Sequence, residues 1–438
     1  MKKTLEKLLA NKARAFLDKH HPIIIGVTGS VGKTSTRHAI ATILSAKYSV
    51  VTSIENYNNE LGLPLSILGE KSPGKNVFGW LKILCSSKRK AAEVYVLEYG
   101  IDHSGDMDAL VAIAKPSIAV MTALSPVHVE FFSSVEQLGE EKAKLLAAVP
   151  SDGLVVLNAD DPNVVGLGSH AVAPIVTYGF RETADVHATD YAIETRSDFS
   201  FQPGEQFSEL HVNVHVSNAR DGHDHPLQSM ESILITLTNQ LGKSAVSSVL
   251  AAIAVAKHLE LSDDQILSKL PELKNEPGRM NPIPGIKGSL ILDSTYNAAP
   301  ASMMAALSVL SEFQPVENAK RIAVLGHMAE LGAQTEQEHR MVGMRAAEVC
   351  DRLITVGEAA HHIRHAAIEA GMPEEHTAEF AHPVEAGRWL DHEIKKGDIV
   401  LVKGSQSARM EKVVKDVMAE PLRARELLVR QSKKWIKS

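Results

Sequence analysis

The segment Thr28-Gly29-Ser30-Val31-Gly32-Lys33-Thr34-Ser35 combines two glycines with a lysine and hydroxyl side chains, between an apolar run and a helical pattern. Glycines let backbone N–H groups close around phosphate oxygens, and the following helix N-terminus adds the positive end of its dipole. In such a loop Lys33 reaches the β- and γ-phosphates of a nucleotide, and the Thr34 hydroxyl holds Mg²⁺. The full motif requires glycine where this chain has Val27, so only the shorter pattern Gly29-x-x-Gly32-Lys33-Thr34 is present. We predict a phosphate-binding loop rather than an ordinary glycine turn, because a strand pattern precedes it and a helix pattern follows.

Three further residues are of types that suit acid–base or metal chemistry. Glu98 ends a buried-strand pattern, His128 follows the next such pattern, and Lys142 comes fourteen residues after His128. A carboxylate at the carboxyl edge of a parallel sheet can hold a metal ion on a nucleotide. Taken singly, Glu98 is equally explained as a sheet-end charge facing water, and His128 and Lys142 as surface residues. Their spacing alone does not join them into one site.

Composition and charge exclude several classes of protein. The 46 Lys and Arg against 53 Asp and Glu give a net charge of −7, which does not support nucleic-acid binding through a general positive field. Two cysteines, Cys85 and Cys350, cannot form a disulfide framework or a four-thiolate zinc site, and they favour a reducing compartment. His361 and His365 lie four residues apart, but no glutamate follows His361 as zinc proteases require.

The elements that must position these residues alternate along the chain. Residues 1–20 show the apolar spacing of an amphipathic helix, and short buried-strand patterns occur at 23–27, 94–97, 118–121 and 153–157 with helical stretches between them. Strand and helix in alternation predict an α/β fold with a parallel sheet covered on both faces. Two alternating segments, 210–216 and 232–237, predict antiparallel strands on either side of a polar loop at 218–228.

Prolines and glycines between residues 271 and 284 predict a linker. Beyond it the alternation restarts, with strands expected at 289–292, 321–325, 353–356 and 399–402. We therefore predict an N-terminal helix over 1–20, a central ATP-binding α/β domain over 21–273 that carries the phosphate loop, and a Rossmann-like α/β domain over 274–438.

Several ordered motifs resemble those of the Mur ligase family, over about residues 21–415. Each motif is weak by itself, and their joint order carries the resemblance. They are Thr28-Gly-Ser-Val-Gly-Lys-Thr34, Asn56-Tyr-Asn-Asn-Glu-Leu-Gly-Leu-Pro64, Leu97-Glu-Tyr-Gly100, Ser125-Pro-Val-His-Val-Glu130, Leu157-Asn-Ala-Asp-Asp-Pro162, Pro277-Gly-Arg-Met280, Asp293-Ser-Thr-Tyr-Asn-Ala-Ala-Pro300, Leu325-Gly-His-Met-Ala-Glu-Leu-Gly332 and Val402-Lys-Gly-Ser405.

The resemblance implies roles for the candidate residues. Lys33 and Thr34 would bind the phosphates of ATP and Mg²⁺, and Glu98 and His128 match the family's metal ligands. Lys142 matches the lysine that the family carbamylates, which would make it an anionic oxygen ligand beside Mg²⁺. Arg279 resembles the linker arginine that reaches the γ-phosphate when the last domain closes. Asp293 and Asn297 would face the nucleotide from that domain.

The resemblance also implies a reaction in two steps. A substrate carboxylate attacks the γ-phosphate of ATP to give an acyl phosphate and ADP, and an amine then displaces phosphate to leave an amide. The motifs most resemble the MurF group, so we expect UDP-MurNAc-peptide and D-Ala-D-Ala as substrates in peptidoglycan precursor synthesis. Two alternatives stay open: a ligase of another carboxylate, of the polyglutamate or folate type, and a nucleotide-binding relative without catalysis. The joint presence of Glu98, His128, Lys142 and Arg279 argues against the last.

The chain departs from the family pattern at several points. About twenty residues precede the first strand, whereas a full enzyme of this type has a separate N-terminal domain for the UDP-sugar. Residues 244–248 stand where the family has asparagines that help to bind adenine. Ala299, His327 and Gln406 stand where asparagine, aspartate and arginine are usual, which predicts an altered choice of amine acceptor.

Residues 75–90 form an insertion that mixes aromatic and aliphatic residues with a basic end. One hypothesis is a helix that lies on a membrane surface, and the other is an extra helix packed on the core. The N-terminal residues lack the continuous apolar core of a secretory signal, and no apolar window is long enough to span a bilayer. We therefore expect a cytoplasmic monomer that does not bind nucleic acid.

Overall fold

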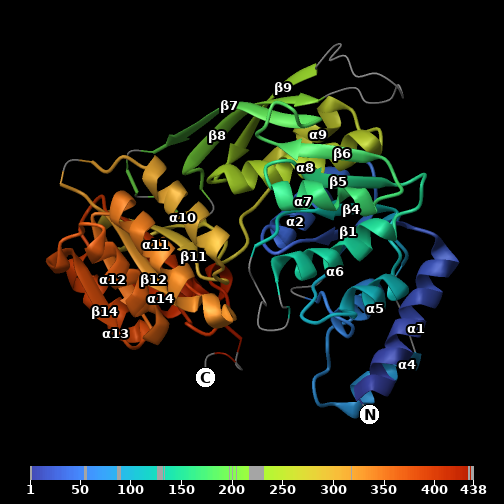
Figure 1. Cartoon of the computed structure of the whole chain (residues 1–438), viewed down its shortest axis with the longest axis horizontal. Helices are drawn as coiled ribbons and strands as arrows, with labels where there is room; N and C mark the ends of the chain where they lie inside the picture. Colours follow the sequence, from blue (N-terminus) through green and yellow to red (C-terminus); the bar gives the residue numbers. More distant parts are fainter. Residues whose placement is uncertain are drawn as a thin grey trace.

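The structure is a computed structural model that describes residues 2–53, 57–85, 90–125, 132, 134–196, 198–199, 201–203, 205–216, 231–316, 318–432 and 435. Within these residues the chain forms two α/β domains that lie side by side, the first coloured blue to yellow-green and the second orange to red (Figure 1). The predicted fold class is therefore confirmed.

In the described part of the chain, nine strands form the sheet of the first domain. Its parallel part runs through β6 and β7, after which β7, β8 and β9 pair antiparallel. In sheet order the strands are β2 (Val50–Thr52), β3 (Val94–Glu98), β1 (Ile23–Thr28), β4 (Ile118–Met121), β5 (Leu154–Asn158), β6 (Ile175–Gly179), β7 (Val186–Thr195), β8 (Ser208–Val216) and β9 (Glu231–Thr238).

Helices cover both faces of this sheet, because alternate side chains of each buried strand point to opposite sides. Ile25 and Val27 of β1 pack with α2 (Lys33–Leu44) and α8 (Lys243–His258) in one core cluster. Ile24 of the same strand packs in a second cluster with α1 (Lys2–His20), α3 (Gly62–Leu68), α5 (Asp106–Ile113) and α6 (Val135–Ala147). The predicted N-terminal helix is thus confirmed as α1, packed on the first domain.

The second domain has six strands in the described residues, and β10 at the edge is the one that runs antiparallel to its neighbour. In sheet order they are β10 (Asn281–Pro284), β11 (Leu290–Ser294), β15 (Ile399–Lys403), β12 (Arg321–Gly326), β13 (Arg352–Val356) and β14 (Thr377–Phe380). Its longer helices are α10 (Pro300–Glu312), α11 (Thr335–Val349), α12 (His361–Glu369), α13 (Pro383–Glu393) and α14 (Glu411–Val417).

Short helical segments complete both domains. The short α-helices are α7 (Pro162–Gly166), α9 (Asp263–Lys269) and α15 (Ala424–Leu427). The 3-10 turns are η1 (Leu167–His170), η2 (Leu270–Glu272), η3 (Ile286–Gly288), η4 (Gly332–Gln334), η5 (Glu358–Ala360), η6 (Glu374–His376) and η7 (Pro421–Arg423).

The predicted linker at 271–284 is corrected at its C-terminal end. Residues 281–284 form β10 although they contain Pro282 and Pro284. Proline cannot donate a backbone hydrogen bond, so it fits a strand at a sheet edge, and β10 lies there. The predicted polar loop at 218–228 lies outside the described residues.

The insertion at 75–90 forms α4 (Val77–Cys85). Ile83 of α4 is buried in the same cluster as α1, and Lys12 of α1 donates hydrogen bonds to the carbonyls of Ile83 and Leu84 at 2.5 and 2.9 Å. The helix is therefore packed on the core along one face. Among the described helices, none combines the length and the apolar character that crossing a bilayer requires.

Candidate active site

A cavity of about 1040 Å³ opens between the two domains. Its walls come from the phosphate loop and α2, the start of α8, the segment that joins the domains, and the ends of β11 and β15. Strands of parallel sheets present ligand sites at their carboxyl ends, so this is where such a fold binds substrates.

The predicted phosphate loop lines this cavity and has the backbone geometry of such a loop. Gly29 and Gly32 have φ of 141° and 87°, which disfavour any residue with a side chain. A Cβ on Gly29 would lie 2.1 Å from the hydroxyl of Thr122, so the loop could not keep this path with another residue. Gly32 caps α2 without a side chain, which leaves the helix N-terminus open toward the cavity.

Lys33, the first residue of α2, folds back over the loop. Its Nζ donates hydrogen bonds to the carbonyls of Gly29 at 2.8 Å and Ser30 at 3.3 Å. Burial lowers the pKa of Lys33, and Glu98 opposes that shift by attracting the ammonium. The ammonium lies in the loop that would enclose phosphate oxygens.

Glu98 is buried at the end of β3 and has several partners, so it is not a sheet-end charge facing water. The Thr34 hydroxyl donates to its Oε2 at 3.0 Å, and the Asn58 amide donates to its Oε1 at 3.2 Å. Nε of Arg37 lies 3.6 Å from Oε2. The fold thus joins the predicted residues Thr34 and Glu98 directly.

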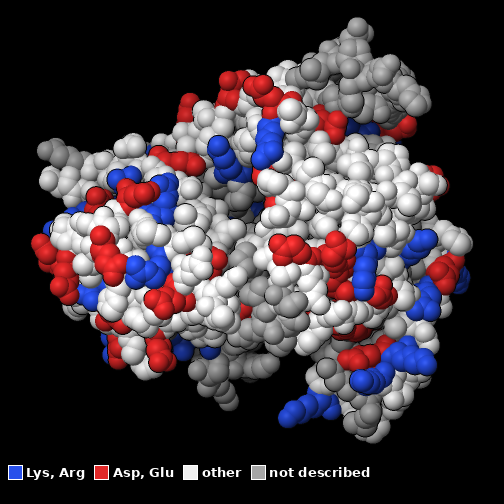
Figure 2. Space-filling view, in the orientation of Figure 1, with Lys and Arg blue, Asp and Glu red and all other residues white. Residues whose placement is uncertain are grey.

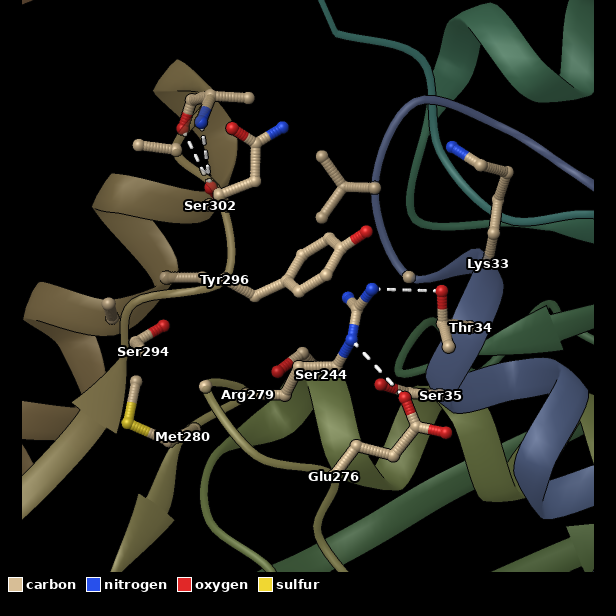
Figure 3. Close-up of a pocket in the computed structure, with 18 of the residues that line it drawn as sticks. Lys33, Thr34, Ser35, Ser244, Glu276, Arg279, Met280, Ser294, Tyr296 and Ser302 are labelled. Atoms are coloured by element: carbon tan, nitrogen blue, oxygen red, sulfur yellow. Dashed lines mark hydrogen bonds and ion pairs between the residues drawn. The ribbon is translucent and has the colours of Figure 1, made fainter. Parts of the chain in front are cut away.

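Arg279, in the segment that joins the domains, reaches across the cavity to the phosphate loop. Its Nη2 donates to the Thr34 hydroxyl at 2.9 Å, and its Nε lies 3.6 Å from Oε2 of Glu276 (Figure 3). Its guanidinium also stacks on the ring of Tyr296, 4.2 Å from the ring centre. Arg279 therefore contacts residues of both domains at once.

Lys142 is buried on α6, and its Nζ donates to the carbonyl of Gly29 at 3.2 Å. Burial, and then the positive charge of Lys33, hold the pKa of Lys142 well below its usual range. Its amine therefore lies against the backbone of the phosphate loop. His128 lies outside the described residues, so its position relative to Glu98 and Lys142 is not part of this geometry.

On the side of the second domain, Asn297 lines the cavity, and its carbonyl accepts a hydrogen bond of 2.8 Å from Lys403. Burial lowers the pKa of Lys403 to about 7.

Asp293 is placed differently from the expectation that it faces the nucleotide. Its carboxylate is fully buried and accepts hydrogen bonds from the backbone of Gly278 at 3.0 Å and of Thr295 at 3.1 Å. Asp293 therefore holds the joining segment in place at Gly278 through this hydrogen bond.

Sequence reasoning assigned no role to three residues of this network: Arg37, Glu276 and Tyr296. Arg37 lies three residues after Thr34 on the same helix face, which was a usable signal. The contacts of Glu276 with Nη2 of Arg37 at 3.5 Å and of Tyr296 with Arg279 join distant parts of the chain, so no local pattern reveals them.

The positions that depart from the family pattern lie mostly on the cavity wall. Ser244, Ala245 and Ser248 line it at the start of α8, and the Ser248 hydroxyl lies 3.3 Å from that of Thr36. Ala299 and Gln406 line it from the second domain. His327 lies in a smaller cavity of about 200 Å³ instead, with its Nε2 3.0 Å from the Ser407 hydroxyl.

The described residues contain no group of three or more His, Cys, Asp or Glu side chains that could hold a metal ion. The oxygens of Thr34 and Glu98 nonetheless fit Mg²⁺, because proteins hold this ion through one or two carboxylates together with substrate phosphates. In this structure both oxygens have an arginine as neighbour: Arg279 donates to the Thr34 hydroxyl, and Nε of Arg37 lies 3.6 Å from Oε2 of Glu98.

Comparisons with known proteins agree with this geometry. The model of the Mur ligase middle domain matches residues 27–256, and that of the Mur ligase, glutamate ligase domain matches residues 278–406. The UDP-N-acetylmuramoyl-tripeptide–D-alanyl-D-alanine ligase of Escherichia coli K12 is 30% identical, over 90% of this chain and 76% of the relative. The enzyme of that name from Bacillus subtilis 168 is 26% identical, over 94% of this chain and 80% of the relative.

Solved structures are similar over most of their length. The MurF ligase of Thermotoga maritima in complex with ADP matches with a TM-score of 0.75 and 25% identity, over 96% of this chain and 84% of that one. A MurF of Acinetobacter baumannii matches with a TM-score of 0.74 and 25% identity, over 94% and 79%. The predicted resemblance is confirmed, and the chain belongs to the Mur ligase family.

Proposed function

We propose that this chain is an ATP-dependent amide ligase of peptidoglycan precursor synthesis. It joins the amine of D-alanyl-D-alanine to the terminal carboxylate of a UDP-MurNAc-tripeptide through an acyl phosphate. The observation that carries the proposal is the contact of Arg279 with Thr34 of the phosphate loop on one side and Tyr296 of the second domain on the other. The reactions named for the two bacterial relatives support the choice of substrates.

In the first step the substrate carboxylate attacks the γ-phosphorus of ATP, an oxygen–phosphorus bond forms, and ADP leaves. Lys33 and the N-terminus of α2 hold the phosphates, and Arg279 offsets the charge that spreads over the transferring group. Lys33 donates hydrogen bonds to backbone carbonyls of its own loop. Phosphate oxygens of a nucleotide would replace these neutral acceptors with charged ones, which form stronger hydrogen bonds.

Thr34 and Glu98 are the described residues that would hold Mg²⁺, with His128 expected beside them from the family pattern. When bound, Mg²⁺ would neutralise negative charge on the nucleotide phosphates. Arg37 and Asn58 keep the Glu98 carboxylate in one orientation, as the partners of a metal ligand do.

We further propose that Lys142 is carbamylated. Its burial and its lowered pKa favour the neutral amine, which is the form that adds to CO₂. An N–C bond forms, one proton is released, and an anionic carbamate results. Its distance of 3.2 Å from the Gly29 carbonyl supports a carbamate close to the phosphate loop.

In the second step the amine attacks the acyl carbon, and the carbon–oxygen bond to phosphate breaks after a tetrahedral intermediate. The acyl phosphate must be protected from water, so the two domains enclose it. Arg279 couples this closure to the nucleotide because it contacts both domains. Asn297, Ala299 and Gln406 line the side of the cavity from which the amine enters.

The test is release of phosphate from ATP by the full chain with UDP-MurNAc-tripeptide, with and without D-alanyl-D-alanine. Release that depends on the dipeptide, with equal amounts of amide, is expected. If the dipeptide has no effect, a panel of glutamyl and folyl carboxylates with single amino acids tests the alternative ligase. Failure of the whole panel leaves nucleotide binding without ligation.

A further inference from the structure

Helix α4 carries apolar side chains on two faces, and one of these faces is not covered within the described structure. Ile83 and Leu84 pack toward α1 and the core of the first domain. Val77, Phe78 and Leu81 are instead 61%, 83% and 51% exposed. Single exposed apolar residues are common on protein surfaces, but three within five positions of one helix form a contiguous patch.

Basic residues surround this apolar face, although the whole chain is acidic. The sequence from residue 71 to residue 92 holds six Lys and Arg and no Asp or Glu, against a net charge of −7 for the protein. Four of these lysines lie in the described structure and are exposed: Lys71, Lys75, Lys82 and Lys90. The neighbouring helix α1 adds exposed Lys3, Lys7 and Arg14, together with Leu8.

Acidic side chains near this end of the domain differ in exposure: Asp18 of α1 and Glu93 are exposed. Glu6, Glu60 and Glu70 are partly buried, and burial raises the pKa of Glu60. Figure 2 shows Lys and Arg among acidic side chains at the lower right end, where Figure 1 places α1 and α4.

We propose that the exposed face of α4, formed by Val77, Phe78 and Leu81 with Lys71, Lys75 and Lys82, docks the protein on the surface of a bilayer that contains anionic lipids. Apolar and aromatic side chains enter the boundary between headgroups and acyl chains, while lysines attract the negative surface. Neither contribution is large here, because three apolar residues and a few lysines make a small contact, so binding is reversible and sensitive to salt.

The position of α4 is compatible with catalysis on the membrane. In Figure 1 α1 and α4 lie at the end of the first domain that points away from the second domain. None of the α4 residues lines the cavity between the domains. A bilayer that covers α4 therefore leaves the relative movement of the domains free. The proposal does not depend on which carboxylate or amine the enzyme uses.

The test is flotation of the full chain with vesicles of phosphatidylcholine alone and with vesicles that contain 30% phosphatidylglycerol. Binding to the anionic vesicles, weakened several-fold by 0.5 M NaCl, is expected. Cys85 is exposed at the end of α4 and Cys350 is buried, so a polarity-sensitive fluorophore attached to Cys85 reports contact in solution. Its emission should rise with anionic vesicles and stay unchanged with neutral ones.

The variant Phe78→Ser with Leu81→Ser should lose at least tenfold in vesicle affinity while its thermal midpoint and its phosphate release stay as in the parent. Leu422→Ser is the matched control, because Leu422 is 98% exposed on the second domain and should not matter for vesicle binding. Equal binding of both variants overturns the proposal. Absence of vesicle binding by the parent also overturns it. The same holds if the patch instead forms a dimer that Phe78→Ser dissociates.

Discussion

Nη2 of Arg279 lies 2.9 Å from the hydroxyl of Thr34, although 245 positions separate the two residues in the chain. The same guanidinium stacks on Tyr296 of the second domain. One side chain therefore joins the phosphate loop, the segment between the domains and the second domain. We therefore expect closure of the domains to be coupled to binding of the nucleotide.

Replacing Arg279 by lysine should lower kcat for ATP-dependent ligation by about 10³-fold with a small change in nucleotide affinity. Lysine keeps the charge but cannot contact Thr34 and stack on Tyr296 together, and an arginine at a transferring phosphoryl group is worth about 10³-fold or more. Steady-state kinetics measures this effect. Arg340→Lys is the control, because Arg340 is a partly exposed residue of α11 that does not line the cavity. An unchanged kcat would show that the arginine has no part in phosphoryl transfer.

Glu98→Gln should lower the apparent affinity for Mg²⁺ by about 10- to 100-fold, because the amide supplies a neutral ligand in place of a carboxylate. Titration of Mg²⁺ at fixed ATP measures this effect. Glu140→Gln, on the exposed face of α6, serves as the control. Removal of Mg²⁺ with EDTA should abolish turnover in the parent. The same Mg²⁺ curve for parent and Glu98→Gln contradicts the assignment.

Lys142→Ala should lose activity by at least about 10²-fold, since it removes the proposed carbamate from the phosphate site. Added formate or acetate should restore part of the rate, because a small carboxylate can occupy the space. Lys144→Ala is the control two positions away, at a lysine paired on the surface with Asp108. Full activity of the Lys142→Ala protein excludes the role, and so does the absence of a carbamate signal from the ¹³C spectrum of the parent protein in ¹³CO₂.

The buried amine of Lys403 should make the free energy of unfolding depend on pH. Its pKa is about 7 in the folded protein against 10.5 in the unfolded chain, so between these values the unfolded state binds more protons and stability rises with pH. The slope is at most about 1.4 kcal/mol per pH unit. Chemical unfolding from pH 6 to 10 should show this slope in the parent and in Lys395→Met, and its loss in Lys403→Met. If the free energy of unfolding of Lys403→Met rises with pH as steeply as that of the parent, the prediction is contradicted.

The fold was predictable where strands are buried on both faces, since β1, β3, β4 and β5 are unbroken apolar runs. Two edge strands, β2 and β14, were not predicted, because β2 has three residues and β14 carries a glutamate. The phosphate loop is visible as a local pattern. Among the partners of Glu98, Arg37 has a local signal in its spacing from Thr34 on α2. Asn58 has none, because it reaches Glu98 from the segment between β2 and α3.

The central claim is that ATP phosphorylates a carboxylate to an acyl phosphate, which an amine then attacks to form the amide. The most direct measurement uses UDP-MurNAc-tripeptide with ¹⁸O in its terminal carboxylate, together with ATP, Mg²⁺ and D-alanyl-D-alanine, and mass spectrometry of the products. The account predicts one ¹⁸O in the released phosphate for each amide formed, because the carboxylate oxygen that attacks the γ-phosphorus leaves with it. Amide without label in phosphate, or phosphate without amide, would contradict it.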